Sequence, residues 1–210
     1  MNKKIVVFSL FFLLIVILFF GGQGQEIKNL EKTYINNPTD KNLFELCKVA
    51  LVDEDNDKII EYFPLLITNP NFEELYNSNS QDGVSLTDFT NIYVDTYIFA
   101  CYKELPYDDF KKQFIEIFPY FVFKKDSSSD YTVYLQTHFY KTFTIDKKTT
   151  KDYADVLNLI YEDDSLTKDL RIEGYDFIME WYGLIGELES YQTVKQKKTS
   201  LSGDGSMIES

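Results

Sequence analysis

The chain has 210 residues, of which 44% are apolar, and it carries a formal net charge of −13 at pH 7. A chain of this length can bury one hydrophobic core, so length alone predicts one domain with short flanking segments. The acidic surface repels phosphate backbones and no basic stripe is present, which argues against a nucleic-acid partner. The acidity is explained by solubility alone, although it is also compatible with a basic protein partner.

The N-terminus carries an apolar run, Ile5 to Phe20, directly after the basic residues Lys3 and Lys4. Its length lies at the upper limit for a cleaved signal peptide and near the lower limit for a membrane-spanning helix. We therefore assign residues 1–24 to an uncleaved membrane anchor, with a cleaved signal peptide as the alternative. In both cases the positive-inside rule places the rest of the chain outside the cytoplasm, either at the cell membrane or secreted.

Apolar residues recur at three- and four-residue steps along most of the remaining chain, which is the spacing of amphipathic helices. The densest pattern runs from Ser85 to Lys125 and is interrupted at Leu105-Pro106. Because Pro106 ends the first helix and the link is short, we expect its two halves to fold back on each other as an antiparallel pair. The same spacing predicts further helices that begin near Ile27, Asp40, Asp57, Phe72, Lys151 and Ser165.

The C-terminal third contains two less regular patterns. Residues 131–145 fit a period of two as well as a four-residue step, and we predict a helix because a lone strand would have no partner. The last helix contains Gly174, Gly183 and Gly186, which indicate the close approach of another helix. Lys, Ser, Thr and Gly dominate the end of the chain, which predicts a disordered tail over 192–210.

Two stretches resemble parts of a tetratricopeptide repeat. Residues 57–63 with the turn at 69–71 resemble the second helix and closing turn of a repeat, and residues 100–110 resemble the hinge between its helices. Ile59 and Phe110 stand where that family has a small residue at the helix crossing, and they lie 51 residues apart. The usual repeat length is about 34 residues. The resemblance covers about a third of the chain and implies stacked helical hairpins more than family membership.

The predicted fold is therefore all-α. Consecutive antiparallel helical hairpins over 25–191 are expected to form a short solenoid-like array or an irregular bundle, preceded by the N-terminal hydrophobic helix.

No motif for a serine nucleophile, a phosphate-binding loop or a zinc site is present. Asp53, Asp55 and Asp57 alternate as at the start of an EF-hand loop, but Lys58 and Pro64 occupy the positions of its required glycine and glutamate. We interpret this run as a solvated turn that caps a helix, with weak Ca²⁺ binding as the alternative. We accordingly predict no catalytic residue, no cofactor and no metal.

The only cysteines are Cys47 and Cys101, and each lies on the inward face of the first helix of its hairpin. These equivalent positions meet if the hairpins stack, and the exported compartment permits a disulfide. We favour two buried thiols that pack as small apolar side chains, with a bridge as the alternative.

The chain contains 16 tyrosines and 18 phenylalanines, too many for one core of this size. A tyrosine-rich groove makes a good protein-binding surface, because Tyr combines a large apolar ring with a polar hydroxyl. The candidates for this partner-binding surface are Tyr93, Tyr97, Tyr134 and Tyr140.

We expect a non-catalytic, membrane-anchored module outside the cytoplasm that binds an unknown protein or peptide in a groove between hairpins. One alternative is an exported hydrolase that depends on carboxylates, and another is an acidic inhibitor or immunity-type protein that blocks a basic toxin or enzyme. A concave aromatic groove favours the first function, a deep pocket with carboxylates of raised pKa the second, and a convex acidic face the third.

Overall fold

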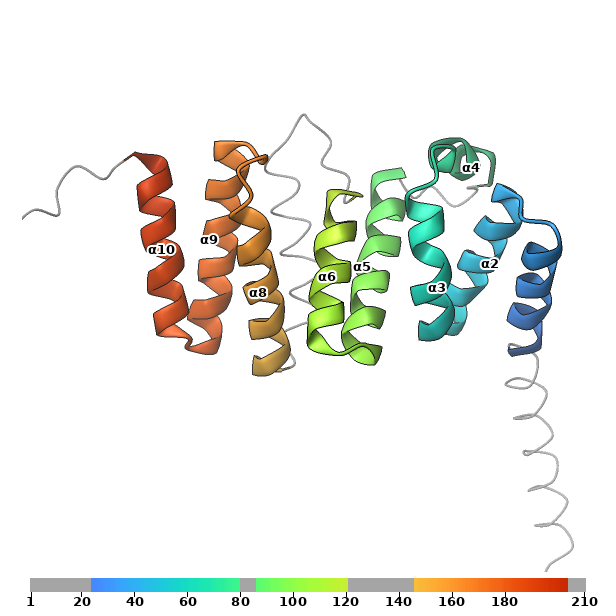
Figure 1. The fold of residues 1–210 in the computed structure, drawn as a ribbon, viewed down its shortest axis with the longest axis horizontal. Coiled ribbons are helices and arrows are strands. Elements are labelled where there is room, and N and C mark those ends of the chain that lie inside the picture. Colours follow the sequence, from blue (N-terminus) through green and yellow to red (C-terminus); the bar gives the residue numbers. More distant parts are fainter. Residues whose placement is uncertain (1–23, 80–85, 121–145, 204–210) are drawn as a thin grey trace, which may run out of the picture. The chain divides into compact units, whose positions relative to one another are not determined.

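The computed structural model describes residues 24–79, 86–120 and 146–203, and every regular element in these ranges is a helix (Figure 1). The predicted all-α class is therefore confirmed for the described part of the chain. The N-terminal apolar run and the ambiguous segment 131–145 lie outside these ranges, and so do Tyr134 and Tyr140.

The chain divides into two compact units, Met1–Val122 and Phe123–Ser210. The prediction of one domain over 25–191 differs from this division. Length and composition do not reveal such a boundary, because it depends on which helices contact each other.

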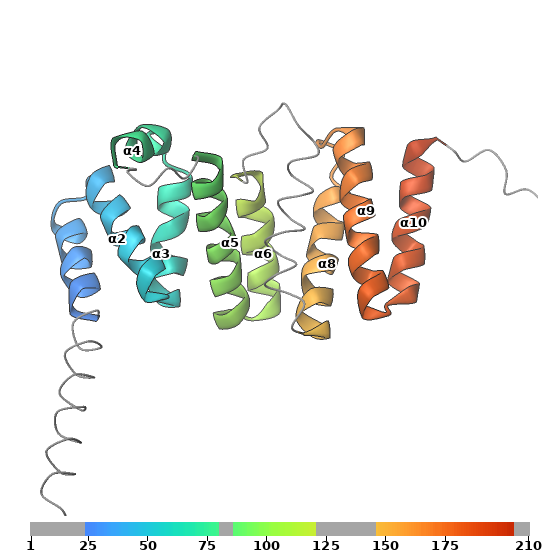
Figure 2. The ribbon, with the colours of Figure 1, turned by 180° about the vertical axis from the view of Figure 1, so that it is seen from behind.

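In the first unit, residues 24–36 are helical. The elements that follow are α2 (Asp40–Asp53), α3 (Asn56–Ile67), α4 (Phe72–Asn79), α5 (Leu86–Glu104), α6 (Tyr107–Ile117) and the short 3₁₀ helix η1 (Phe118–Tyr120). Helix α3 packs against α2 and α5, and α5 packs against α6. Figures 1 and 2 show α2, α3, α5 and α6 side by side, with α4 above the upper ends of α2 and α3.

Polar side chains determine where the early helices begin. The Thr39 side chain accepts a hydrogen bond from the backbone N–H of Asn42 and caps α2, and Asp55 accepts one from the N–H of Lys58 and caps α3. Both replace hydrogen bonds that the first turn of a helix lacks. The alternating aspartates before α3 therefore include a helix cap, as the sequence predicts.

Side-chain contacts attach the first helical segment to α3. Ile27 is buried, and the Glu31 carboxylate pairs with Lys58 and accepts a hydrogen bond of 3.0 Å from the Tyr62 hydroxyl. The hydrogen bond from Lys58 is the main reason that the pKa of Glu31 lies below its ordinary value. Residues 24–36 thus belong to the packed first unit.

The second unit contains α8 (Lys147–Tyr161), α9 (Lys168–Ile185) and α10 (Leu188–Ser202), and α9 packs against both of the others. Gly174 lies where α9 meets the end of α8. A Cβ atom at this position would lie 2.5 Å from three ring atoms of Tyr161. The predicted close helix approach is confirmed at this glycine.

The prediction of a disordered tail from residue 192 is wrong as far as Ser202, because α10 covers this stretch. One apolar side chain of α10, that of Val194, is buried against the rest of the unit. Two of the lysines that suggested disorder pair with acids elsewhere in the unit, Lys197 with Glu162, directly after α8, and Lys198 with Asp176 of α9. Composition alone could not show these pairings.

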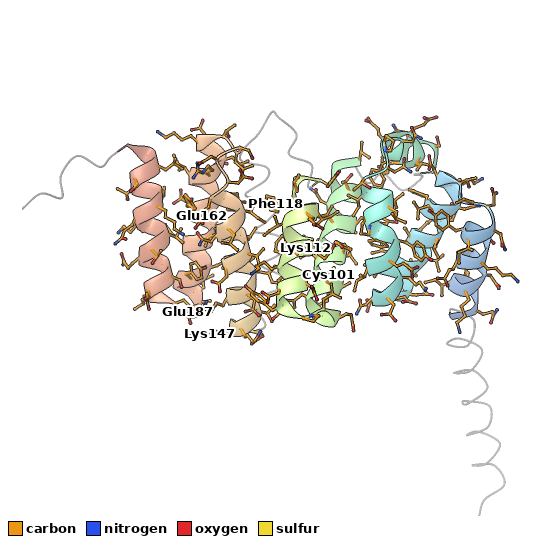
Figure 3. All side chains as sticks on the ribbon, viewed as in Figure 1. Cys101, Lys112, Phe118, Lys147, Glu162 and Glu187 are labelled. Carbon is orange, nitrogen blue, oxygen red and sulfur yellow. The ribbon has the colours of Figure 1, made fainter. Side chains whose placement is uncertain are left out.

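A salt bridge also closes the opposite end of this unit. The Lys147 Nζ atom lies 3.2 Å from a carboxylate oxygen of Glu187, so the beginning of α8 is tied to the turn before α10 (Figure 3). The pair is partly exposed and is expected to contribute little to stability by itself.

Gly186 separates α9 from α10 in a left-handed conformation, with φ 75°. The Gly186→Ala variant should lower the free energy of unfolding of the second unit by about 1 kcal/mol, because a Cβ atom is strained at this φ. Apart from its own chain neighbours, no atom of the described residues lies within 4 Å of the added methyl group, so the effect reports backbone strain alone. Urea unfolding followed by the fluorescence of Trp181, the only tryptophan of the chain, measures it. An unchanged unfolding midpoint would contradict the prediction.

Candidate functional site: a half-buried face of α5

Helix α5 is the central helix of the first unit. It packs against α3 and α6 and also contacts α4 and η1. Every residue from Thr90 to Tyr102 is buried or half-buried. The helix therefore has no face that is fully exposed to water along this stretch.

The residues of α5 nevertheless fall on two distinct faces. At 3.6 residues per turn, the fully buried side chains share one broad face that packs into the unit. The half-buried ones share the opposite face, about a third of the circumference. We call four of them the α5 strip, and these are Ile92, Asp95, Thr96 and Phe99.

Asp95 is the unusual residue of the α5 strip. Its Oδ1 atom has no solvent-accessible surface and receives no hydrogen bond from the described residues. Loss of contact with water raises the pKa of this carboxyl group from 3.8 to about 7. A carboxylate in this position is costly unless it gains a donor or a counter-ion.

The nearest cation along the same face does not supply that counter-ion. Lys103 lies eight residues after Asp95, about 12 Å further along the helix axis. Its Nζ atom is 4.4 Å from the centroid of the Phe99 ring, an arrangement that favours attraction between the cation and the ring. The α5 strip therefore combines a carboxyl group with one buried oxygen that lacks a hydrogen bond from the described residues, apolar side chains on both sides of it and a cation beyond one end.

Tyr93 and Tyr97 do not belong to an exposed binding surface, which corrects the prediction made for them. Both are fully buried on the opposite face of α5, with exposed fractions of 0% and 1%. The Tyr93 ring lies 4.7 Å from the ring of Phe63, and the Tyr97 hydroxyl donates to Gln113 Oε1 at 2.5 Å. Helical spacing identified α5 but could not show which of its two faces the neighbouring helices cover.

The two cysteines of this unit are free and fully buried. This agrees with the favoured interpretation of buried thiols and not with the alternative of a bridge between Cys47 and Cys101. Burial raises the pKa of the Cys101 thiol to about 11, and it raises the pKa of Cys47 as well. Neither thiol has the lowered pKa of a reactive cysteine.

The parts of the chain that the structure describes contain neither a metal-binding cluster nor a membrane-spanning helix. No group of three or more His, Cys, Asp or Glu side chains in these parts is arranged to hold a metal ion. None of their helices has the length and apolar character needed to cross a membrane.

No family model, curated protein or solved structure matches the chain. The resemblance to tetratricopeptide repeats therefore stays a prediction.

Proposed function

We propose that the chain is a non-catalytic interaction module held outside the cytoplasm, and that the α5 strip binds a segment of a partner protein. The half-buried face of α5, with the apolar side chains of Ile92 and Phe99 on either side of Asp95, carries this proposal. A partner that covers this face would bury the half-exposed surface of Ile92 and Phe99, and such apolar contacts form the core of protein interfaces.

The helical architecture supports the same function. In this proposal the successive pairs α2–α3, α5–α6 and α8–α9 are hairpins of a short solenoid-like array, as the repeat resemblance implies. Such arrays need terminal helices with a polar outer face. Helix α10 fits this role, because its exposed residues are mainly polar, including Gln192, Thr193, Lys195, Gln196, Thr199 and Ser200.

The N-terminal sequence supports the location. The apolar run after Lys3 and Lys4 has the composition of an anchor or a signal peptide, and with either one the helices lie outside the cytoplasm. An anchored module of this kind would meet its partner at the cell surface.

The alternative of an exported hydrolase has one observation in its favour. A carboxyl group with a pKa near 7 is suited to general acid catalysis. However, burial is the one cause of the shift in Asp95, and hydrolysis with carboxylates generally needs a second, differently tuned group close by. An interaction module needs the α5 strip alone and no second catalytic group.

Cross-linking in the native cells tests the proposed function. The tagged full-length chain is purified after cross-linking, and the attached proteins are identified by mass spectrometry. We expect one stoichiometric partner whose recovery falls at least about tenfold in Phe99→Ala, since central contacts dominate binding energy. Ile115→Ala, which removes a partly exposed apolar side chain of α6 outside the α5 strip, is the matched control and should retain the partner. Equal recovery from both variants, or no partner at all, would contradict the proposal.

A further inference from the structure

We propose that α10 is a helix of conditional order, which charge pairing holds against α9 and which detaches when those charges are screened or removed. Its detachment uncovers apolar side chains of α9. Figures 1 and 2 show α10 alongside α9, the helix on which it packs. The proposal concerns the second unit and is independent of the α5 strip.

Helix α10 is attached with little apolar burial. It has 15 residues, of which Val194 is the one buried residue, and the apolar side chains of Tyr191 and Leu201 are half-buried. In contrast, α8 has seven buried residues and α9 has six. A helix of this length is marginal alone and depends on packing for its stability. Local stability should therefore be lowest at α10 among the three helices.

The charge of α10 is opposite to that of the chain against which it packs. Residues 188–202 contain three lysines and one glutamate and carry a net charge of +2. Residues 146–187, which include α8 and α9, contain eleven acidic and five basic residues and carry a net charge of −6. Attraction between these charges adds to the limited apolar contact of α10.

Two salt bridges place this attraction at specific atoms. Lys197 pairs with Glu162 and Lys198 pairs with Asp176, and all four side chains are partly exposed. Salt screens exposed pairs, because the Debye length falls from about 20 Å at 20 mM to about 4 Å at 0.5 M. Screening does not act on the apolar contacts that hold α8 and α9 together. Salt should therefore weaken the attachment of α10 selectively.

The face of α9 beneath α10 includes apolar side chains. Asp176 pairs with α10, and a Cβ atom at Gly183 would lie 3.9 Å from the Tyr191 ring, so this face of α9 is turned toward α10. At 3.6 residues per turn, Ile172 and Met179 share the same face, and both are half-buried. Detachment of α10 exposes them to water. Ionic strength therefore controls access to this face.

Hydrogen–deuterium exchange of the full-length chain in a nonionic detergent tests this inference. Peptides from the three helices are compared at about 20 mM and about 500 mM NaCl. The α10 amides should exchange roughly three- to tenfold faster at the higher concentration, the range expected when two exposed ion pairs are lost. The α8 and α9 amides should not exchange faster, because salt also relieves the self-repulsion of this acidic chain.

Variants outside α10 identify the charges responsible. Glu162→Gln combined with Asp176→Asn removes both partners of the α10 lysines, so at low salt it should speed α10 exchange by a similar factor and remove most of the salt effect. Asp163→Asn combined with Asp169→Asn is the matched control, since it removes two other exposed carboxylates of the unit and should change neither. Asparagine at 163 can still accept the hydrogen bond from the Ser165 N–H. Both variants keep the sequence of α10 and the intrinsic exchange rates of its amides.

The oxidation of Met179 by peroxide tests the uncovering of α9. A thioether reacts as it becomes accessible, so the oxidation rate should rise together with α10 exchange at high salt and in the variant that lacks both acidic partners. An unchanged rate would show that α10 does not cover this side chain.

Three exchange results would overturn the inference. Exchange of α10 that does not respond to salt, whether slow or fast, would show that charge does not determine its order. Equal acceleration of all three helices would show unfolding of the whole unit. Equal effects of the two double variants would show that the net charge of the unit, and not the two salt bridges, holds α10.

Discussion

Asp95→Asn should raise the free energy of unfolding of the first unit at pH 8 by roughly 1–3 kcal/mol, allowing for partial solvent screening of the half-buried residue. The unfolded chain holds this carboxyl group in water with its ordinary pKa of 3.8, whereas burial raises the pKa to about 7 in the folded protein. Above pH 7 the folded protein must keep an unpaired charge on α5. Asparagine has a similar shape and carries no charge, so the variant avoids this cost.

The gain should depend on pH. Between about pH 7 and pH 4 the folded state binds a proton at Asp95 that the unfolded state does not bind. The cost of the unpaired charge therefore disappears as the pH falls through this window, and the advantage of Asp95→Asn should be lost near pH 4. A gain that is the same at pH 8 and pH 4 would show that the charge is not its source.

The buried cysteines provide the measurement. Cys47 in α2 and Cys101 in α5 are inaccessible in the folded first unit, so their reaction with a thiol reagent active at acidic pH reports its unfolding in urea. Asp109→Asn is the control, because it removes an exposed carboxylate in the first turn of α6 and should leave the midpoint nearly unchanged. A lower urea midpoint for Asp95→Asn at pH 8 would contradict the prediction.

Gly174→Ala should lower the free energy of unfolding of the second unit by about 2 kcal/mol, although alanine is the better helix former. The added Cβ atom would lie 2.5 Å from atoms of the Tyr161 ring. That ring is fully buried, so it has no solvent into which it can move. Helices α8 and α9 must separate, or the ring must take a strained position.

Gly183→Ala is the matched control for this prediction. It makes the same substitution in the same helix, but its nearest new neighbour is the Tyr191 ring at an ordinary 3.9 Å. The control should be stabilised by up to about 1 kcal/mol, since only the helix preference of alanine remains. The fluorescence of Trp181 follows both variants in urea. Stabilisation of Gly174→Ala would show that the crossing adapts without cost.

The candidate site could be predicted only in part. The sequence drew attention to the central stretch that becomes α5, and it identified Tyr93 and Tyr97 as notable residues there. It did not single out Asp95, because an aspartate within an amphipathic helix usually points to water. Its raised pKa is caused by burial, and its Oδ1 atom is buried without a hydrogen bond from the described residues. An acidic residue on a helix with apolar side chains on several faces was the one signal available.

Local features of the fold were determined by the sequence itself. The starts of α2, α3 and α4, and the break between α5 and α6 at Pro106, lie where the apolar spacing and the prolines indicated. These features depend on contacts between residues a few positions apart, since a helix forms its hydrogen bonds over one turn. The identities of neighbouring residues are therefore sufficient to predict where these helices begin and end.

Only the tertiary structure decided which faces are covered, where the two units divide and that α10 is ordered. The covered face of α5 depends on α3 and α6, and the order of α10 depends on Val194 and on the acids Glu162 and Asp176. Burial and charge pairing join residues that are far apart along the chain. Helical periodicity shows that a side chain lies on a given face, but the free energy of that position is set by whatever packs against it.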